Sequence, residues 1–252
     1  MKNIRIIPRL DIKGHNIVKP VQTEALRIVG NPKELVYKYY EQGADEIIYM
    51  DIVASLYRRN IDFEFLKFVC DGIFIPFTVG GGIRTIKDIN NALRSGADKI
   101  AINTHAINNP EFLSEAIREF GSQCIVLSVD AKKRPNGTWE AYTDGGRERT
   151  GKDAIKWVSE AINLGVGEIL ITSIDMDGTR NGYDISLIEH ISSISTMPVI
   201  TCGGASGPES MLEAINIGKV DALGIASILH YSDFQIPTLK KYLSNEGINT
   251  RI

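Results

Sequence analysis

Two aspartates end two apolar, strand-length runs and are the strongest candidates for acid–base chemistry. Asp11 closes the run IRIIPRLD, and Asp130 closes the run CIVLSVD. A carboxyl group at the mouth of a buried site can donate or accept a proton, and two such groups in different surroundings can divide these roles. The alternative is that each aspartate only caps a loop or a helix where the chain reaches water.

Glycine-rich turns indicate a second kind of chemistry, the binding of phosphate. The segment TVGGGIR contains Gly82, and CGGASG contains Gly203 and Gly204. Glycines in such turns expose backbone N–H groups, which bind phosphate oxygens without the help of a lysine. Later strand ends add side-chain donors and helix starts at Asn103, Thr104, Ala226 and Ser227. Two such clusters predict a ligand with a phosphate at each end.

A repeated pattern predicts the elements that carry these residues. Helical segments end at a glycine, and an apolar, β-branched run follows, as in GADEIIYMD and GVGEILITSID. Glycine is the usual residue after a helix end, and continuous apolar runs are typical of strands buried on both faces. We expect eight strands, which end near residues 11, 51, 80, 103, 130, 175, 202 and 226.

Helix starts and chain length predict the fold class. Proline stands at a probable first helical position in Asn31-Pro32, Asn109-Pro110 and Gly207-Pro208. Eight strands that alternate with helices in 252 residues indicate an α/β protein with one domain, residues 1–252, folded as a (β/α)8 TIM barrel. FTVGGGIRT resembles VITCGGASG, which suggests two duplicated half-barrels. In such barrels the site lies at the carboxyl ends of the strands.

Composition excludes several classes of function. The chain is 43% hydrophobic and 23% charged, with a formal net charge of -3, so neither nucleic acid nor a membrane surface is expected as partner. Its apolar runs are much shorter than the roughly 20 residues of a membrane span, and we expect a cytoplasmic protein. The cysteines and histidines lack metal-ligand spacing, which predicts reduced thiols and neither metal nor cofactor.

Two insertions are expected at the mouth of the barrel. Lys19 lies on a long first segment that runs to residue 30 and is expected to form a lid loop without regular secondary structure. This lysine either pairs with a substrate anion or is a solvated charge. In the second insertion, KRPNGTWEAYT, the Asn-Gly pair predicts a hairpin turn.

Four charged residues lie near the beginnings of strands, at the end of the barrel opposite the expected site. Their alternating signs suggest a salt-bridged ring that closes the narrow end, whereas ordinary surface ion pairs are the alternative. These residues are Arg5, Glu46, Lys99 and Glu168.

Taken together, the motifs resemble the cyclase subunits of imidazole glycerol phosphate synthase, a family of histidine biosynthesis. The resemblance covers essentially the whole chain and is most specific in TVGGGIR, DKIAINT, FGSQCIVLSVDAK, GEILITSIDMDGT and ASILH. It implies that Asp11 and Asp130 form a general acid/base pair and that Lys19 acts on the first loop. The implied phosphate-site residues are Gly82, Asn103 and Thr104 at one end, and Asp177, Gly178, Gly204, Ala226 and Ser227 at the other.

The same resemblance implies a partner and a reaction. A separate glutaminase subunit is expected to dock at the N-terminal face of the barrel and to form a heterodimer. Its ammonia passes through the barrel, where Arg5, Glu46, Lys99 and Glu168 correspond to a gate, and attacks a ribulosyl bisphosphate intermediate. The implied products are imidazole glycerol phosphate and aminoimidazole carboxamide ribotide.

The opening segment departs from the family pattern, which usually reads Cys-Leu-Asp-Val-Lys-Asp-Gly-Arg. A cation two residues before Asp11 points to the same side of the strand and, if it faces inward, lowers the proton affinity of that carboxylate. Some relatives with an altered first loop are second copies that deliver ammonia to a sugar amidotransferase in surface-polysaccharide biosynthesis, which is the alternative function. The departures are Arg9, Gly14, His15, Asn16, Pro20 and Thr23.

Overall fold

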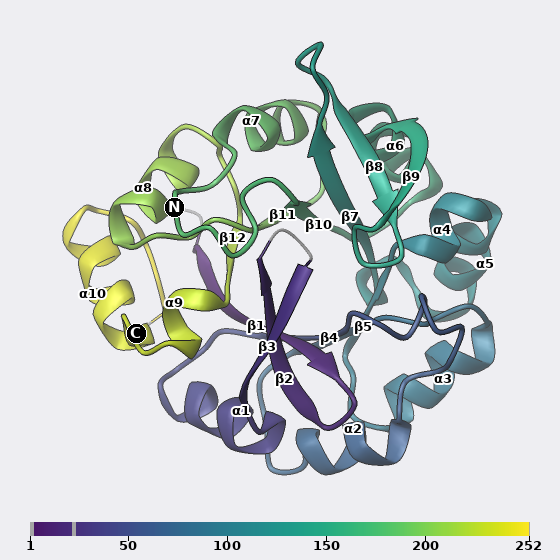
Figure 1. Ribbon diagram of the computed structural model, residues 1–252, viewed down its shortest axis with the longest axis horizontal. Helices are drawn as coiled ribbons and strands as arrows, with labels where there is room; N and C mark the ends of the chain where they lie inside the picture. The colour runs from purple at the N-terminus through teal and green to yellow at the C-terminus, as the bar shows by residue number, and fades with distance from the viewer. Residues whose placement is uncertain (1–2, 22–23, 252) are drawn as a thin grey trace.

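The computed structural model, which describes residues 3–21 and 24–251, is a closed barrel of parallel strands surrounded by helices (Figure 1). In this part of the chain eight strands pair in sequence around the ring, and β1 closes it by pairing with both β4 and β12. The predicted (β/α)8 fold is confirmed. The barrel strands are β1 (Arg5–Lys13), β4 (Ile47–Asp51), β5 (Phe77–Gly80), β6 (Lys99–Ile102), β7 (Ile125–Lys133), β10 (Glu168–Ser173), β11 (Val199–Cys202) and β12 (Ala222–Ile225).

Helices follow the barrel strands and cover the outside of the ring. They are α1 (Pro32–Glu41), α2 (Phe63–Cys70), α3 (Ile86–Arg94), α4 (Thr104–Asn108), α5 (Glu111–Phe120), α6 (Ala154–Leu164), α7 (Ile185–Ile194), α8 (Pro208–Asn216), α9 (Ser227–His230) and α10 (Ile236–Asn245), with a 3-10 turn η1 at Ser122–Cys124. The Asn31 side chain caps α1 by accepting hydrogen bonds from the next turn. As predicted, α1 and α8 begin at proline, whereas α5 begins one residue after Pro110. None of the described helices is long and apolar enough to cross a membrane.

The first segment after β1 is a hairpin, so the expectation of a loop without secondary structure was wrong. Strand β2 (Asn16–Val21) pairs antiparallel with β1 and with β3 (Glu24–Gly30). Gly14, with φ of 60°, forms the turn, and the buried Ile17 and Val18 hold β2 against the barrel. These two apolar side chains explain why the segment is ordered. The departure at Thr23 lies outside the described residues.

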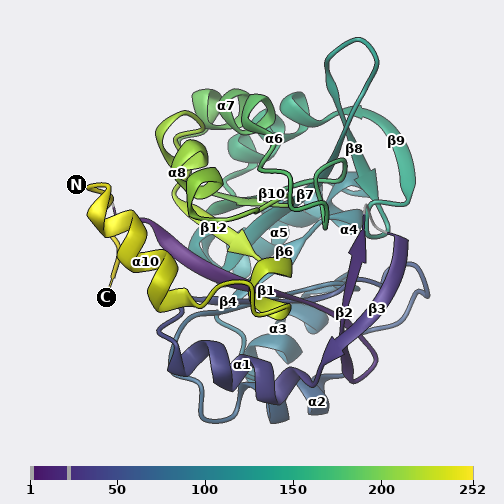
Figure 2. The ribbon, with the colours of Figure 1, turned by 60° about the vertical axis from the view of Figure 1, so that its left-hand side comes forward.

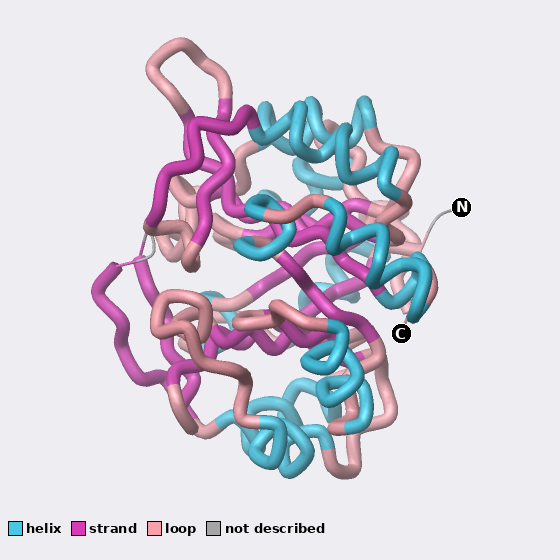
Figure 3. The backbone as a smooth tube through the Cα atoms, turned by 90° about the vertical axis from the view of Figure 1, so that its right-hand side faces the viewer, coloured by secondary structure: helices cyan, strands magenta, loops and turns pink. Residues whose placement is uncertain are grey.

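The second insertion is the predicted hairpin. Strand β8 (Trp139–Thr143) pairs antiparallel with β7 and with β9 (Glu148–Asp153), and the turn between β7 and β8 contains Gly137 with φ of 83°. Strands β1 and β7 lie four places apart in the ring and therefore face each other. Figures 2 and 3 show both hairpins at one end of the barrel, while the two termini lie toward the other end.

Apolar side chains fill the inside of the barrel. Alternate residues of each strand point inward because the side-chain period of a strand is two. This inner cluster is separate from the larger core between strands and helices, and its members include Ile7, Ile48, Val126, Leu170, Ile200 and Ala222. Cys124 and Cys202 are buried, Cys70 is half-buried, and all three are free thiols, as predicted. An apolar interior therefore separates the two charged ends of the barrel.

Candidate active site

The first glycine turn borders an open pocket at the carboxyl ends of the strands. This pocket has a volume of about 480 Å³, and Gly82, Asn103, Thr104 and Asp130 line it together. Gly81 and Gly82 both have positive φ, 98° and 70°, and lie directly after β5. The structure thus brings the predicted first phosphate-binding residues beside one predicted catalytic carboxylate.

The second glycine turn lies on the other side of the barrel mouth. Gly203 and Gly204 follow β11 with φ of 91° and 102°, so both glycines have positive φ, as in the first turn. The pocket here is much smaller, about 20 Å³, because side chains already fill it. It is lined by predicted site residues Lys19, Asp177, Gly178, Gly203, Gly204, Ala226 and Ser227.

Both predicted aspartates lie between these two pockets and are buried. A small central pocket of about 30 Å³ has Asp11, Asp130 and Asp177 in its wall. Asp11 is 2% exposed and Asp130 9% exposed. The two ends and the centre together form a trough, which we define by the residues of these three pockets, across the mouth of the barrel.

Different surroundings shift the pKa values of the two carboxyl groups in opposite directions. Burial raises the pKa of Asp130 to about 6, and the attraction of Arg9 opposes this only in part. Burial also acts to raise the pKa of Asp11, but the charges of Arg9 and Lys19 outweigh it, and the pKa lies below its ordinary value. Asp11 is therefore the ionised member of the pair, and Asp130 is the one that can carry a proton near neutral pH.

Asn103 holds Asp130 in place. Its Nδ2 donates to Asp130 Oδ2 at 3.0 Å and to the backbone oxygen of Tyr142 at 3.1 Å, so both amide hydrogens are engaged. The Thr104 hydroxyl accepts from the Asp144 N–H at 2.9 Å and keeps its own hydrogen for another acceptor. The side chain of Asn103 thus orients the carboxyl group, a role that differs from the predicted phosphate contact.

Lys19 is a buried cation, so the interpretation as a solvated charge was wrong. It is 3% exposed, and its Nζ lies 2.7 Å from Asp177 Oδ1 and 3.4 Å from Asp11 Oδ2. Burial acts to lower the pKa of Lys19, but the two carboxylates raise it above the ordinary value. Strand β2 therefore carries a permanent positive charge into the second end of the trough.

Arg9 lies on the same side of strand β1 as Asp11, as the strand period predicts, and the structure shows that this side faces inward. Its Nε donates to Asp11 Oδ1 at 2.9 Å, and its Nη1 donates to Thr172 Oγ1 at 2.7 Å. The backbone oxygen of Arg9 accepts from Nε2 of buried His230, whose pKa falls to about 4 chiefly through burial. Since Nε2 must carry the hydrogen in this bond, Nδ1 accepts from the Tyr39 hydroxyl at 2.7 Å.

One further carboxylate at the mouth of the barrel, Asp51, was not predicted from the sequence. Asp51 ends β4, is 5% exposed, lines the same pocket as Gly82 and pairs with Arg59 at 2.8 Å. Burial raises the pKa of Asp51 despite this ion pair. The run IIYMD ends at this aspartate as the run before Asp11 does, so the strand-end rule contained the signal for it.

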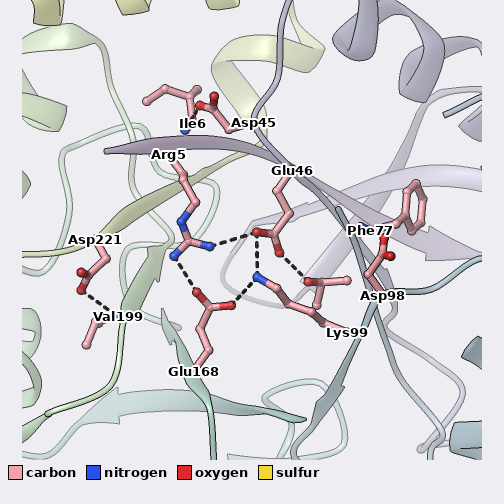
Figure 4. Close-up of polar contacts among 11 residues, drawn as sticks. Arg5, Ile6, Asp45, Glu46, Phe77, Asp98, Lys99, Glu168, Val199 and Asp221 are labelled. Carbon is pink, nitrogen blue, oxygen red and sulfur yellow. Dashed lines mark hydrogen bonds and ion pairs between the residues drawn. The ribbon is translucent and has the colours of Figure 1, made fainter. Parts of the chain in front are cut away.

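The opposite end of the barrel is closed by the predicted ring of ion pairs (Figure 4). Arg5 lies 2.9 Å from Glu46 and 2.5 Å from Glu168, and Lys99 lies 2.9 and 2.8 Å from the same two carboxylates. Buried Thr78 donates its hydroxyl hydrogen to Glu46 at 2.6 Å. Each carboxylate thus contacts both cations, which excludes the alternative of isolated surface pairs.

Known proteins resemble this chain along most of its length. Residues 5–235 match the family described as histidine biosynthesis protein. Imidazole glycerol phosphate synthase subunit HisF of Legionella pneumophila is 55% identical over 204 residues, which cover 81% of this chain and 96% of that protein. Subunits of the same name from Hydrogenobaculum sp. (strain Y04AAS1) and Streptococcus sanguinis (strain SK36) are 47% and 43% identical over 248 residues, 98% of both chains in each case.

The closed barrel, with a charged trough at one end and an ion-pair ring at the other, is therefore a protein of the histidine biosynthesis class. Within that class the chain belongs to the HisF family, the cyclase subunits of imidazole glycerol phosphate synthase.

Proposed function

We propose that this chain uses ammonia from a glutaminase partner to convert a ribulosyl bisphosphate intermediate into imidazole glycerol phosphate and aminoimidazole carboxamide ribotide. Its membership of the HisF family supports the reaction class. The observation that carries the proposal is the pair of buried carboxyl groups, Asp11 and Asp130, between two glycine-lined ends of one trough.

Asp130 is the general acid and Asp11 the general base in this proposal. A carboxyl group with a pKa near 6 holds a proton for part of the time at neutral pH and can give it to a leaving oxygen. Asp11 remains ionised beside Arg9 and Lys19, and an ionised carboxylate can accept a proton from attacking ammonia. The division of roles therefore follows from burial and neighbouring charges.

The two ends of the trough bind the two phosphates. At the first end the backbone of Gly81 and Gly82 and the Thr104 hydroxyl supply donors around an open pocket. At the second end Gly203, Gly204 and Ser227 supply them, and Lys19 adds a charge. Because that end is nearly filled, a bound phosphate displaces Asp177 from Lys19 and takes its place.

Ammonia enters through the ring of Arg5, Glu46, Lys99 and Glu168 in this proposal. The glutaminase subunit docks on the N-terminal face around the ring and forms a heterodimer with the chain in the cytoplasm. The apolar interior above the ring admits neutral ammonia more readily than ammonium, because an unpaired charge is costly in such surroundings. The ring then acts as a gate between the partner and the interior.

One observation favours a second candidate function. Arg9 and Lys19 crowd the centre and second end of the trough, and the opening segment departs from the family pattern. These features suit a chain that passes ammonia to a sugar amidotransferase. The retained carboxyl pair and both glycine turns favour the first function, since ammonia delivery alone requires neither.

The decisive experiment supplies the purified protein with the ribulosyl bisphosphate and an ammonium salt at high pH and follows substrate consumption. We expect turnover, and Asp130→Asn should reduce it by about 10²-fold or more because the proton donor is lost. Glu115→Gln, which changes an exposed carboxylate on α5 in the same way, is the control. Absence of turnover in the unchanged chain refutes the first function and leaves ammonia delivery.

A further inference from the structure

Arg9 crosses the mouth of the barrel. It starts from β1, and its hydrogen bond to Thr172 ends on β10, three places away in the ring. Arg9 is the residue that lines all three pockets of the trough. Its guanidinium therefore lies where the middle of any ligand that reaches from one glycine turn to the other must pass.

The contacts of Arg9 leave hydrogen-bond donors for such a ligand. A guanidinium has five N–H groups in a fixed plane. Two donate to Asp11 and Thr172, and a third is directed at the Cys202 thiol. Two N–H groups therefore remain, and the ion pair with Asp11 fixes the plane in which they point.

The charges around Arg9 determine whether the ligand group that binds there is charged or neutral. Three carboxylates, Asp11, Asp130 and Asp177, border the central pocket, and the cations near them are Arg9, Lys19 and Arg147. Asp11 and Asp177 already neutralise Arg9 and Lys19 through ion pairs. The centre thus has no large excess of positive charge for a further anion, but it does have free donors for a neutral oxygen.

We propose that Arg9 is a specificity-determining residue that donates hydrogen bonds to a neutral carbonyl or hydroxyl oxygen in the middle of a bisphosphate ligand. The inference rests on the proposed function for the two phosphate ends and adds what is recognised between them. The family pattern usually has cysteine at this position, which lacks the donors of a guanidinium, so we expect the arginine to strengthen recognition of this oxygen in this chain.

Direct binding tests this role without turnover. The probes are ribulose 1,5-bisphosphate and pentane-1,5-diol bisphosphate, which has phosphates at both ends but no oxygen between them. Calorimetry should show about tenfold tighter binding of the first by the unchanged chain, as expected for hydrogen bonds to a charged donor. In Arg9→Cys this preference should fall to about twofold or less, whereas Arg118→Met, on the exposed face of α5, should keep it.

Thr172→Val provides a second variant in case Arg9→Cys does not fold. It removes the hydrogen bond that holds Nη1 and leaves the charge in place, so the preference should fall severalfold in a chain with an unchanged melting temperature. Equal binding of the two probes by the unchanged chain, or an unchanged preference in Arg9→Cys or Thr172→Val, overturns the role of Arg9.

The two proposals fail separately. A chain that prefers ribulose 1,5-bisphosphate but does not consume the ribulosyl substrate keeps the role of Arg9 and loses the proposed reaction. A chain that consumes the ribulosyl substrate but shows no preference between the two probes keeps the proposed reaction and loses the role of Arg9. Failure to bind either bisphosphate, together with no consumption of the ribulosyl substrate, overturns both proposals.

Discussion

At the scale of single residues, the proposed acid is held in an environment that costs stability. Burial raises the pKa of Asp130 from the ordinary 3.8 to about 6, with smaller contributions from the nearby carboxylates Asp11 and Asp177. The folded chain therefore binds this proton more tightly than the unfolded chain does. Ionisation of Asp130 at neutral pH destabilises the fold, and we attribute this cost to catalysis.

Replacement of Asp130 by asparagine should therefore stabilise the fold in a pH-dependent way. Well below pH 4 the carboxyl group is protonated in both the folded and the unfolded state, and its ionisation does not affect the free energy of unfolding. Between about pH 4 and 6 the unfolded state ionises first, so the unchanged chain loses stability as pH rises. Above pH 6 the cost levels off at up to about 3 kcal/mol, and Asp130→Asn avoids it.

Urea unfolding from pH 4 to pH 8 measures this effect. The advantage of Asp130→Asn in free energy of unfolding should grow across that range, while its catalytic turnover is lost. A difference that is constant with pH would show that the Asp130 pKa is not raised in the folded chain. The result matters for mechanism because a raised pKa is the basis for the assignment of Asp130 as acid.

At the scale of elements, two equivalent turns position the two ends of the trough. Asn103 follows β6 and Ala226 follows β12, and the two residues have nearly the same backbone angles. For Asn103 φ is -119° and ψ is -84°, and for Ala226 φ is -128° and ψ is -80°. Gly81 and Gly204, in the two glycine turns, have no room for a side chain. A Cβ on Gly81 would lie 2.1 Å from the Asp51 oxygen, and one on Gly204 would lie 2.0 Å from the Gly182 oxygen.

Gly204→Ala should therefore displace the turn after β11 and weaken ligand binding at the second end. Gly137→Ala is the matched control, because Gly137 also has positive φ but no atom within 4 Å of its would-be Cβ. Both variants carry the left-handed backbone cost of roughly 1 kcal/mol. We expect binding of ribulose 1,5-bisphosphate to weaken at least tenfold in Gly204→Ala alone, and equal affinities would argue against this turn as a phosphate site.

The sequence predicted elements well wherever local chemistry decides them. Glycine after helix ends and apolar runs located the strands, and seven of the eight end within two residues of the predicted positions. Strands β1 and β7 run further because each pairs with an antiparallel hairpin. The hairpin after β1 was missed because Ile17 and Val18 gain their order from packing on the barrel, which sequence spacing does not show.

Side-chain contacts across the barrel could be predicted only in part. Strand period placed Arg9 on the side of Asp11, but the hydrogen bond to Thr172 joins residues 163 positions apart. Arg5 and Glu168 are also 163 positions apart. Only the closed ring of strands brings the residues of these two pairs into contact. Alternating charge at strand starts nevertheless indicated the ring. The duplication of half-barrels stays a prediction, supported by the matching turns.

At the scale of the whole molecule, the barrel separates two charged ends by an apolar interior. The ring lies at the strand beginnings, the trough lies at their carboxyl ends, and the inner cluster around Ile48 and Leu170 fills the space between them. A molecule built this way can receive a small neutral nucleophile at one end and use it at the other, away from water.

This arrangement predicts that damage to the ring affects one source of ammonia and not the other. Arg5→Ala leaves Lys99 alone between Glu46 and Glu168, both nearly fully buried, and so disrupts the entrance on the proposed partner face. Turnover with glutamine and the glutaminase subunit should fall roughly tenfold, equivalent to about 1.4 kcal/mol of barrier. Turnover with ammonium salt should change little, because external ammonia reaches the trough from its open side.

Lys156→Ala, which removes an exposed cation on α6, is the control for charge. Equal losses with both nitrogen sources would mean that the ring only stabilises the barrel, since a structural defect lowers both rates alike.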